Sequence, residues 1–305
     1  MQLRQQTIFL CALVCAALCG QQVVHAHGFE GNRFFPPTLA TDDPFAVDEL
    51  ALPSFTFLKN AAGDDGPSNH EYDLGFEFDK EIFPYFAVGV SNTYVIQKPK
   101  GDRSVKGWSN LTLTAKYEFL HNAEHEMIMS IGLEADLGGV GNSNFADPFS
   151  TLSPTLYFGK GFGDLPDRLA ALQPFAVTTT LAQSFPTSAR AANEFDWGIA
   201  VEYSLPYLQQ HVKDLGIPAP FKDMIPLVEF AMATTENRGV GGLTTGTVNP
   251  GVLYVTPYYE LGVEANIPVN HQSGAHVGVT VQLWIFIDDI FPHTFGHPLF
   301  GGERE

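Results

Sequence analysis

The stretch that decides the fold is LTLTAKYEF, residues 111–119, in which every second residue is apolar. The same alternation runs through residues 127–137, 195–205, 259–267 and 277–285. Successive side chains of a β-strand point to opposite faces, so each run predicts a strand with one apolar and one polar face. Average globular strands have roughly 5–6 residues, whereas a tilted strand that crosses a bilayer needs about 9–11. These runs match the longer length and predict membrane-crossing strands.

Eleven strands are expected from this pattern, and a twelfth is needed because single-chain bacterial barrels have an even number. The expected strands lie near residues 52–59, 71–80, 85–96, 107–119, 126–138, 150–160, 173–184, 194–205, 225–236, 251–267 and 275–287. The twelfth is predicted either in residues 295–300 or in the segment that precedes the first strand.

The connections between these strands differ in character, which orients the barrel. The polar, glycine-rich connections, expected on the extracellular side, are residues 63–68, 98–103, 138–147, 185–193 and 237–249. Between them lie tighter joints at residues 83–84 and 121–125 and two longer ones at residues 161–168 and 206–223.

The N-terminus predicts export. Arg4 precedes an apolar run at residues 8–18, and the small-residue sequence at 24–26 suits cleavage after Ala26. This is the pattern of a secretory signal peptide and is too short for a membrane-spanning helix. All three cysteines fall inside it, so the mature chain is expected to lack thiol chemistry and disulfides.

Three regions are therefore expected: a signal peptide (residues 1–26), an irregular N-terminal leader (residues 27–50) and a barrel (residues 51–305). The leader shows no sustained apolar period, which suits a segment that lines or plugs a barrel mouth.

The charge balance excludes several classes of partner. The chain has 16 Lys and Arg against 34 Asp and Glu, a formal net charge of −18. Nucleic acids are recognised through basic patches, so no nucleic-acid partner is expected. No apolar stretch in the sequence after the signal peptide reaches the length of a membrane helix, and only a closed barrel satisfies the backbone of strands in lipid.

The phase of the alternation predicts an acidic inner wall. If the apolar positions face lipid, twelve carboxylates and one lysine face the lumen. These residues are Glu71, Asp73, Glu77, Asp79, Lys116, Glu118, Glu134, Asp136, Asp196, Glu202, Glu229, Glu260 and Glu264. Acidic side chains that line a pore favour cations, although they can also be ordinary solvated charges. A barrel of about twelve strands suits a narrow path and not a wide pore.

No catalytic site and no cofactor are expected. His121 and His125 match an H-x-x-E-H zinc pattern, but they lie in a turn and not on the helix that this motif requires. One metal hypothesis remains. After cleavage, His27 would offer its α-amino group and its imidazole, a pair suited to copper, with His293, His297, His271 or His276 completing the site. The alternative is that His27 is only the first residue of a flexible leader and binds no metal.

The last expected hairpin carries a family resemblance. Residues 259–268 read YELGVEANIP and residues 276–284 read HVGVTVQLW. This hairpin resembles those of outer-membrane transporters grouped with the meta-pathway phenol-degradation proteins, and the similarity of strand rhythm covers roughly residues 50–290. The resemblance implies an outer-membrane β-barrel and the passage of hydrophobic or aromatic compounds, and it transfers no catalytic residue. The chain departs from the common barrel ending, because residues 287–305 follow the last expected strand instead of a terminal aromatic residue.

The sequence thus predicts an all-β, antiparallel up-and-down transmembrane β-barrel of about twelve strands in the outer membrane of a Gram-negative cell. We expect a porin-like channel or transporter for small solutes, either hydrophobic or aromatic compounds or cations. Its expected partners are outer-membrane lipid, a small-molecule solute and the barrel-insertion machinery. Two alternatives stand beside it: a secreted or periplasmic soluble β-protein with a metal-binding role, and a structural barrel with a filled lumen.

Overall fold

The computed structural model describes residues 27–62, 67–238 and 241–302. Its strands are β1 (Phe29–Glu30), β2 (Arg33–Phe34), β3 (Glu49–Asn60), β4 (Asn69–Phe83), β5 (Phe86–Pro99), β6 (Val105–Trp108), β7 (Leu111–Asn122), β8 (Met127–Leu137), β9 (Thr151–Gly161), β10 (Phe175–Pro186), β11 (Glu194–Tyr203), β12 (Met224–Thr235), β13 (Thr244–Val255), β14 (Tyr259–Pro268) and β15 (Gly278–Phe286). Short helices lie at α2 (Leu205–Tyr207) and α3 (Ile287–Ile290). Within these described ranges, no helix is both long enough and apolar enough to cross a membrane.

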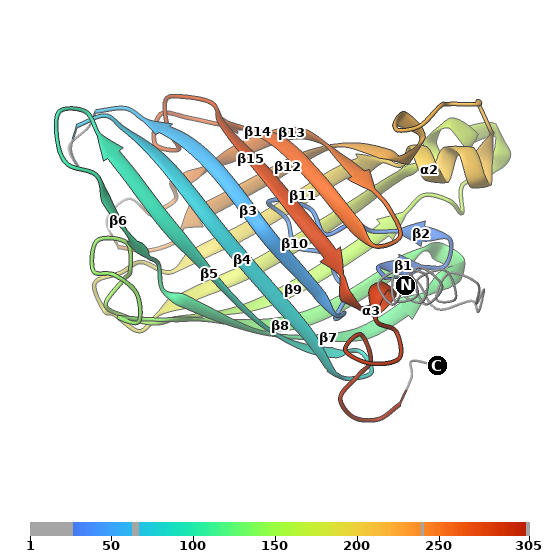
Figure 1. The fold of residues 1–305 in the computed structure, drawn as a ribbon, viewed down its shortest axis with the longest axis horizontal. Coiled ribbons are helices and arrows are strands. Elements are labelled where there is room, and N and C mark those ends of the chain that lie inside the picture. The colour runs from blue at the N-terminus through green and yellow to red at the C-terminus, as the bar shows by residue number, and fades with distance from the viewer. Residues whose placement is uncertain (1–26, 63–66, 239–240, 303–305) are drawn as a thin grey trace, which may run out of the picture.

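The strands from β3 to β15 form one closed antiparallel barrel (Figure 1). Each strand pairs with the next along the chain, and β15 pairs with β3 to complete the ring. The short β6 and the longer β7 both pair with β5 and together make one interrupted strand. The barrel therefore has twelve strands, which confirms the predicted all-β, up-and-down fold class.

The prediction of individual strands was wrong at two places, residues 251–267 and the location of the twelfth strand. Residues 251–267, expected as one strand, belong to two strands, β13 and β14, which a turn at residues 256–258 separates. The first half of β13 was expected in the loop at residues 237–249. Its sequence, TTGTVNPGVLYV, places Thr244, Gly246 and Pro250 at outward positions, where alternation would show large apolar residues, so the pattern is hidden. Residues 295–300 form no strand, and β1 and β2 pair only with each other.

The barrel has two distinct ends. The leader end carries the connections at residues 84–85, 123–126, 162–174, 204–223 and 256–258, together with the segment after β15. The loop end carries the connections at residues 61–68, 100–104, 138–150, 187–193, 236–243 and 269–277. Both the start of β3 and the end of β15 lie at the leader end, as an even number of strands requires (Figure 1).

The two faces of the wall are inverted relative to a soluble protein. On β14, Leu261 and Val263 are 45% and 42% exposed, while Glu260 and Glu264 are 0% and 2% exposed. Large apolar residues are likewise exposed around the barrel: Leu74, Phe78, Val88, Leu113, Tyr117, Phe119, Ile131, Leu133, Leu152, Leu181, Phe195, Ile267 and Val279. A wall that shows apolar side chains outward and carboxylates inward suits lipid outside and a polar lumen inside. This distribution is that of a transmembrane barrel and opposes a soluble sandwich, whose apolar faces would be packed together.

Candidate functional site: a polar lumen narrowed by the leader

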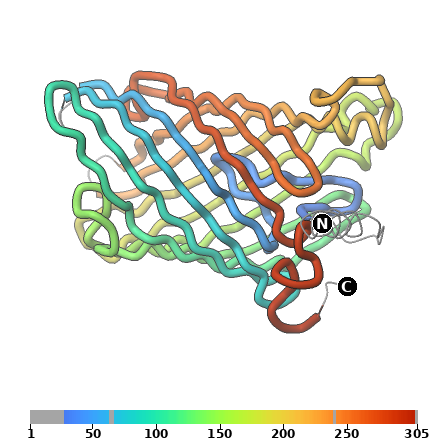
Figure 2. The backbone as a smooth tube through the Cα atoms, in the orientation of Figure 1, coloured from blue at the N-terminus to red at the C-terminus, as the bar shows by residue number. Residues whose placement is uncertain are grey.

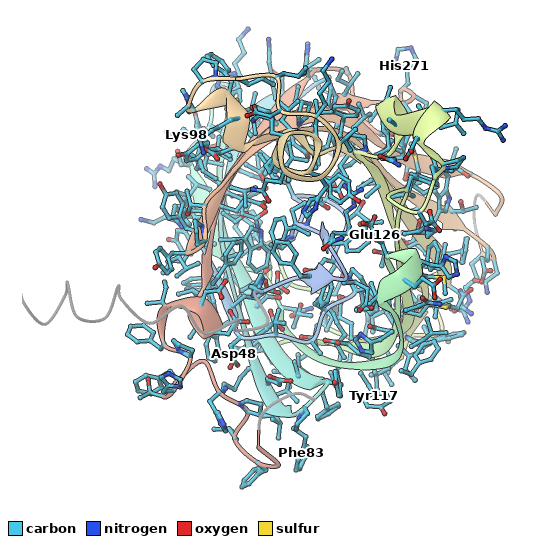
Figure 3. All side chains as sticks on the ribbon, turned by 90° about the vertical axis from the view of Figure 1, so that its right-hand side faces the viewer. Asp48, Phe83, Lys98, Tyr117, Glu126 and His271 are labelled. Atoms are coloured by element: carbon cyan, nitrogen blue, oxygen red, sulfur yellow. The ribbon has the colours of Figure 1, made fainter. Side chains whose placement is uncertain are left out.

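Residues 49 and 50 of the predicted leader belong to β3, and the segment before them, residues 27–48, lies inside the barrel and is called the leader below. It enters at the leader end, forms the β1–β2 hairpin and then crosses the lumen to reach β3 (Figure 2). Viewed along the barrel, the short strands lie within the ring formed by the long strands (Figure 3). Phe35, Thr41, Asp43 and Asp48 of the leader are all 0–1% exposed. The predicted signal peptide, residues 1–26, lies outside the described residues.

Apolar contacts hold the leader against the inner wall. Phe35, Phe45 and Val47 of the leader pack with Ile128 of β8 and Ala176 of β10. Complete burial of each such side chain contributes about 1.5–3 kcal/mol. The hydrophobic core of this protein is thus formed between the leader and the inside of the barrel.

Two further clusters share one leader residue. Phe34 packs against the cluster of Ala51, Trp284 and Phe286, and also against a cluster on β12 and β13. Phe286 contacts the rings of His27 and Phe34 of the leader, and Trp284 belongs to the same cluster at the leader end of the lumen.

A wall carboxylate binds the bend of the leader. Both oxygens of Glu229 on β12 accept leader hydrogen bonds: from the backbone nitrogens of Leu39 (3.0 Å), Ala40 (3.1 Å) and Thr41 (2.7 Å), and from Thr38 Oγ1 (2.7 Å). Glu229 is 0% exposed. An irregular segment has no ladder to pair its N–H groups, and an unpaired buried N–H is costly. Glu229 supplies the acceptors that this segment lacks.

Other carboxylates bind the leader in the same way. Glu118 on β7 accepts a hydrogen bond from the backbone nitrogen of Ala46. In the reverse direction, Asp48 of the leader accepts from the backbone nitrogen of Glu81 at 2.7 Å and pairs with Lys80 Nζ at 2.7 Å. The inner acidic side chains thus serve in part as hydrogen-bond acceptors that fix the leader.

A buried cation anchors the leader hairpin. Arg33, 1% exposed, pairs through Nε with Glu126 at 3.1 Å and donates to the carbonyl oxygens of Pro174 and Gln173. Its guanidinium lies 3.7 Å from the ring centroid of Tyr207, whose hydroxyl donates to Glu126 at 2.8 Å. Arg33 therefore joins the leader to three connections at the leader end, residues 123–126, 162–174 and 204–223. Figure 3 shows Glu126 at this end of the ring.

The first described residue is also fixed on both of its ring nitrogens. His27 Nδ1 lies 3.0 Å from Asp288 and Nε2 lies 3.2 Å from Glu49, and the ring stacks on Phe286 with centroids 4.2 Å apart. Burial alone would lower the pKa of His27, but the neighbouring carboxylates, Asp288 first, outweigh it and raise the pKa well above its usual value. His27 therefore links the leader to β3 and to α3 as a cation.

The charge of His27 predicts a pH dependence of leader binding. Its stabilising contribution is complete below the ordinary histidine pKa of about 6.5 and is lost as the pH rises through the raised pKa. We expect trypsin to cleave after Arg33 severalfold faster at alkaline than at neutral pH. Each rate is first divided by the rate at which trypsin cleaves a short peptide at the same pH. In the variant His27→Gln, this ratio of cleavage rates should not change with pH. An equal rise of the ratio in wild type and variant would contradict the role of His27.

The residues of the two metal hypotheses are not brought together. His27 uses both ring nitrogens on carboxylates, while His297 Nδ1 contacts the carbonyl oxygen of Pro298 at 2.7 Å and His293 is exposed. His121 pairs with Glu30 and Glu118, and His125 with Asp164 instead. In the described part of the chain, no group of three or more His, Cys, Asp or Glu side chains is placed to hold a metal ion. Copper binding by a free α-amino group at His27 stays a prediction.

Beyond the leader, towards the loop end, the lumen contains a cavity of about 470 Å³. Ala40 and Asp42 of the leader form one side of it, and strands β8 to β13 form the rest. Its polar lining consists of the carboxylates of Asp42, Glu134 and Asp196 and the hydroxyls of Ser153, Thr155, Tyr157, Thr180, Ser184 and Thr245. Lys116 pairs with Asp42 at 2.8 Å and so places one cation at the edge of this acidic cavity. A space of this composition is suited to polar and positively charged solutes.

The thirteen predicted lumen residues fall into distinct environments. Lys116, Glu118 and Glu229 contact the leader, and Glu134 and Asp196 line the cavity. Glu202, Glu260 and Glu264 are 0–2% exposed near the leader end. Glu71, Asp73, Glu77 and Asp79 on β4 and Asp136 on β8 are half-buried.

Sequence reasoning did not identify the residues that hold the leader. Arg33 comes from the leader, and Glu126 and Tyr207 come from two connections without strand alternation, so nothing in their spacing indicates that they meet. A single arginine in an otherwise acidic and apolar leader is the one signal that points to an internal ion pair.

Solved structures of outer-membrane channels and of an autotransporter β-domain resemble this chain. No protein-family model and no curated protein matches it. Among solved structures, an outer membrane channel from Pseudomonas putida F1 is 11% identical and covers 82% of this chain and 99% of its own, with a TM-score of 0.49. The KdgM porin is 12% identical, and the match covers 77% of this chain and 98% of the porin, with a TM-score of 0.43. The β-domain of the Bordetella autotransporter BrkA is 11% identical, and the match covers 79% of this chain and 99% of that domain, with a TM-score of 0.45.

These similarities are too distant to transfer a solute or a mechanism. None of them links the chain to the meta-pathway phenol-degradation proteins, so this finer part of the resemblance has no support beyond the strand rhythm.

Proposed function

We propose that this protein is an outer-membrane channel that passes small polar solutes, with a preference for cations, through a lumen narrowed by its own leader. The observation that carries the proposal is the acidic cavity of about 470 Å³ inside a closed barrel with an apolar outer wall. The barrel is exported under this proposal, is inserted by the cell's barrel-insertion machinery and is surrounded by outer-membrane lipid.

The lining of the cavity favours cations over hydrophobic or aromatic compounds. Three carboxylates and six hydroxyls line the space, and one of the carboxylates, Asp42, is paired with Lys116. Fixed negative charges that line a narrow path concentrate cations and repel anions.

A structural barrel with a filled lumen is the second candidate. The observation that favours it is the burial of the leader, which occupies the leader end of the lumen with apolar side chains and satisfied hydrogen bonds. Such a barrel would insert into membranes but conduct nothing.

Reversal potentials in planar bilayers test the proposal. Under a KCl gradient we expect cation selectivity, and the double variant Glu134→Gln, Asp196→Asn should lower the cation-to-anion permeability ratio about fivefold, which corresponds to roughly 1 kcal/mol of lost attraction. Asp214→Asn, a change of an exposed carboxylate in the connection at residues 204–223, is the matched control and should leave the ratio unchanged. Absence of any conductance would favour the filled barrel, and an unchanged ratio in the double variant would exclude the cavity as the selective element.

A further inference from the structure

The chain continues past the last strand as a segment outside the ring. After β15 it forms α3 and then residues 291–302, which are called the tail below. The tail passes β3 and reaches the end of β4, outside the ring of strands and near the labelled Phe83 (Figures 1 and 3). The tail therefore lies beside the barrel wall and does not cover the lumen.

The tail is fixed to the part of β4 that extends past β3. The pairing of β3 with β4 begins at Glu49 opposite Asp79, so the last residues of β4 continue beyond it. There the backbone nitrogens of Leu299 and Phe300 donate to the carbonyl oxygens of Glu81 (3.2 Å) and Ile82 (2.9 Å). Lys80 Nζ also donates to the carbonyl oxygen of His297 at 2.8 Å. These contacts give the tail a defined position on the wall.

The side chains that the tail presents are apolar and uncovered. Phe291, Phe295, Leu299 and Phe300 are 49%, 74%, 57% and 59% exposed. Residues 290–300, IFPHTFGHPLF, contain no Asp, Glu, Lys or Arg. Exposed apolar groups of this extent on a fixed segment mark a contact surface.

This surface is continuous with the lipid-facing wall. The ring of Phe300 lies 5.6 Å from the ring of Phe83, and Phe83 lies 6.4 Å from Phe86. Phe83 is 49% exposed at the end of β4, on the same outer face as Phe78 and Leu74. Aromatic side chains at this level of a barrel sit where the hydrocarbon meets the headgroups.

We propose that the tail is an interfacial membrane anchor, which places Phe291, Phe295, Leu299 and Phe300 in the lipid at the leader end of the barrel. Amphipathic segments at a membrane surface bury their apolar side chains about 5–10 Å deep, at the boundary between headgroups and acyl chains. The anchor joins the end of the chain to the lipid, while α3, through Asp288 and His27, joins it to the leader. The inference rests on the proposed membrane barrel but not on any conductance.

Spin-label accessibility in lipid vesicles tests the anchor. The cysteines of the chain all lie in residues 1–26, so single cysteines can be introduced at Phe295 and at Phe300 of the processed protein. Two reference positions are matched to them: Ile131, 51% exposed on the outer wall, and Val140, 58% exposed in a connection at the loop end. We expect the ratio of oxygen to aqueous nickel-complex accessibility at residues 295 and 300 to be severalfold higher than at residue 140.

Each other outcome has a definite meaning. A ratio at residues 295 and 300 equal to that at residue 140 would overturn the anchor, because the tail would be in water. Labels shielded from both reagents would also overturn it and indicate a protein partner or a second copy of this chain. If the reference label at Ile131 were itself in water, the membrane barrel would fail, and the proposed function with it.

Discussion

The variant Glu229→Gln is expected to release the leader from the lumen. The change keeps the volume of the side chain but replaces one acceptor oxygen by an NH₂ group that faces the backbone N–H groups of Leu39, Ala40 and Thr41. Hydrogen bonds to a charged acceptor contribute about 1.5–3 kcal/mol each, and a buried donor without a partner costs about 1–3 kcal/mol. Loss of about 3 kcal/mol would raise the population of undocked leader roughly a hundredfold.

Trypsin cleavage after Arg33 measures this release. Arg33 is 1% exposed and should be protected while the leader is bound. We expect the fragment that begins at Phe34, identified by mass, to form much faster in Glu229→Gln than in wild type. Glu71→Gln is the matched control, since Glu71 also faces the lumen but accepts from Asn60 and Gln97 near the loop end. Equal cleavage in the two variants would contradict a specific role for Glu229.

Among substitutions in the leader itself, Arg33→Met is expected to weaken the binding of the leader most. It leaves the carboxylate of Glu126, a residue that is 4% exposed, without its buried cation. Removal of one partner from a buried ion pair costs about 3–5 kcal/mol, mainly because the remaining charge stays buried. Hydrogen exchange of the leader, followed by mass spectrometry, should therefore become at least about a hundredfold faster, without unfolding of the barrel.

A double variant separates charge from packing at this site. Arg33→Met combined with Glu126→Gln removes the unpaired charge and should recover a large part of the protection of the leader. Protection in Arg33→Met equal to that of wild type would show that the arginine does not anchor the leader. A double variant no better than the single one would assign the effect to lost packing on Tyr207 instead.

The barrel could be predicted from the sequence because its wall repeats one local pattern. Alternation such as that of residues 111–119 depends only on neighbouring residues and on which side of the strand meets lipid. Strand β13 is the exception. In β13, Gly246 and Pro250 stand at outward positions and interrupt the alternation, and only the register with β12 places them in the wall.

The role of the inner carboxylates could not be predicted in this way. Alternation placed Glu118 and Glu229 among the inward side chains but left open what they face. Their partners are backbone N–H groups of the leader, about 70 to 190 residues away in the sequence. A backbone donor has no sequence signature, so an acidic wall that binds cations and one that binds an irregular segment look alike until the leader is placed.

Deletion of the leader tests the central claim most directly. The claim is that the leader narrows the lumen of a conducting barrel, so a variant without residues 28–47 is compared with wild type in planar bilayers. Unheated and boiled gels first establish that both barrels are folded, by faster migration of the unheated form. The account predicts a small, cation-selective conductance for wild type and a severalfold larger, less selective one for the deletion variant. Equal conductance and equal selectivity in two folded proteins would contradict it.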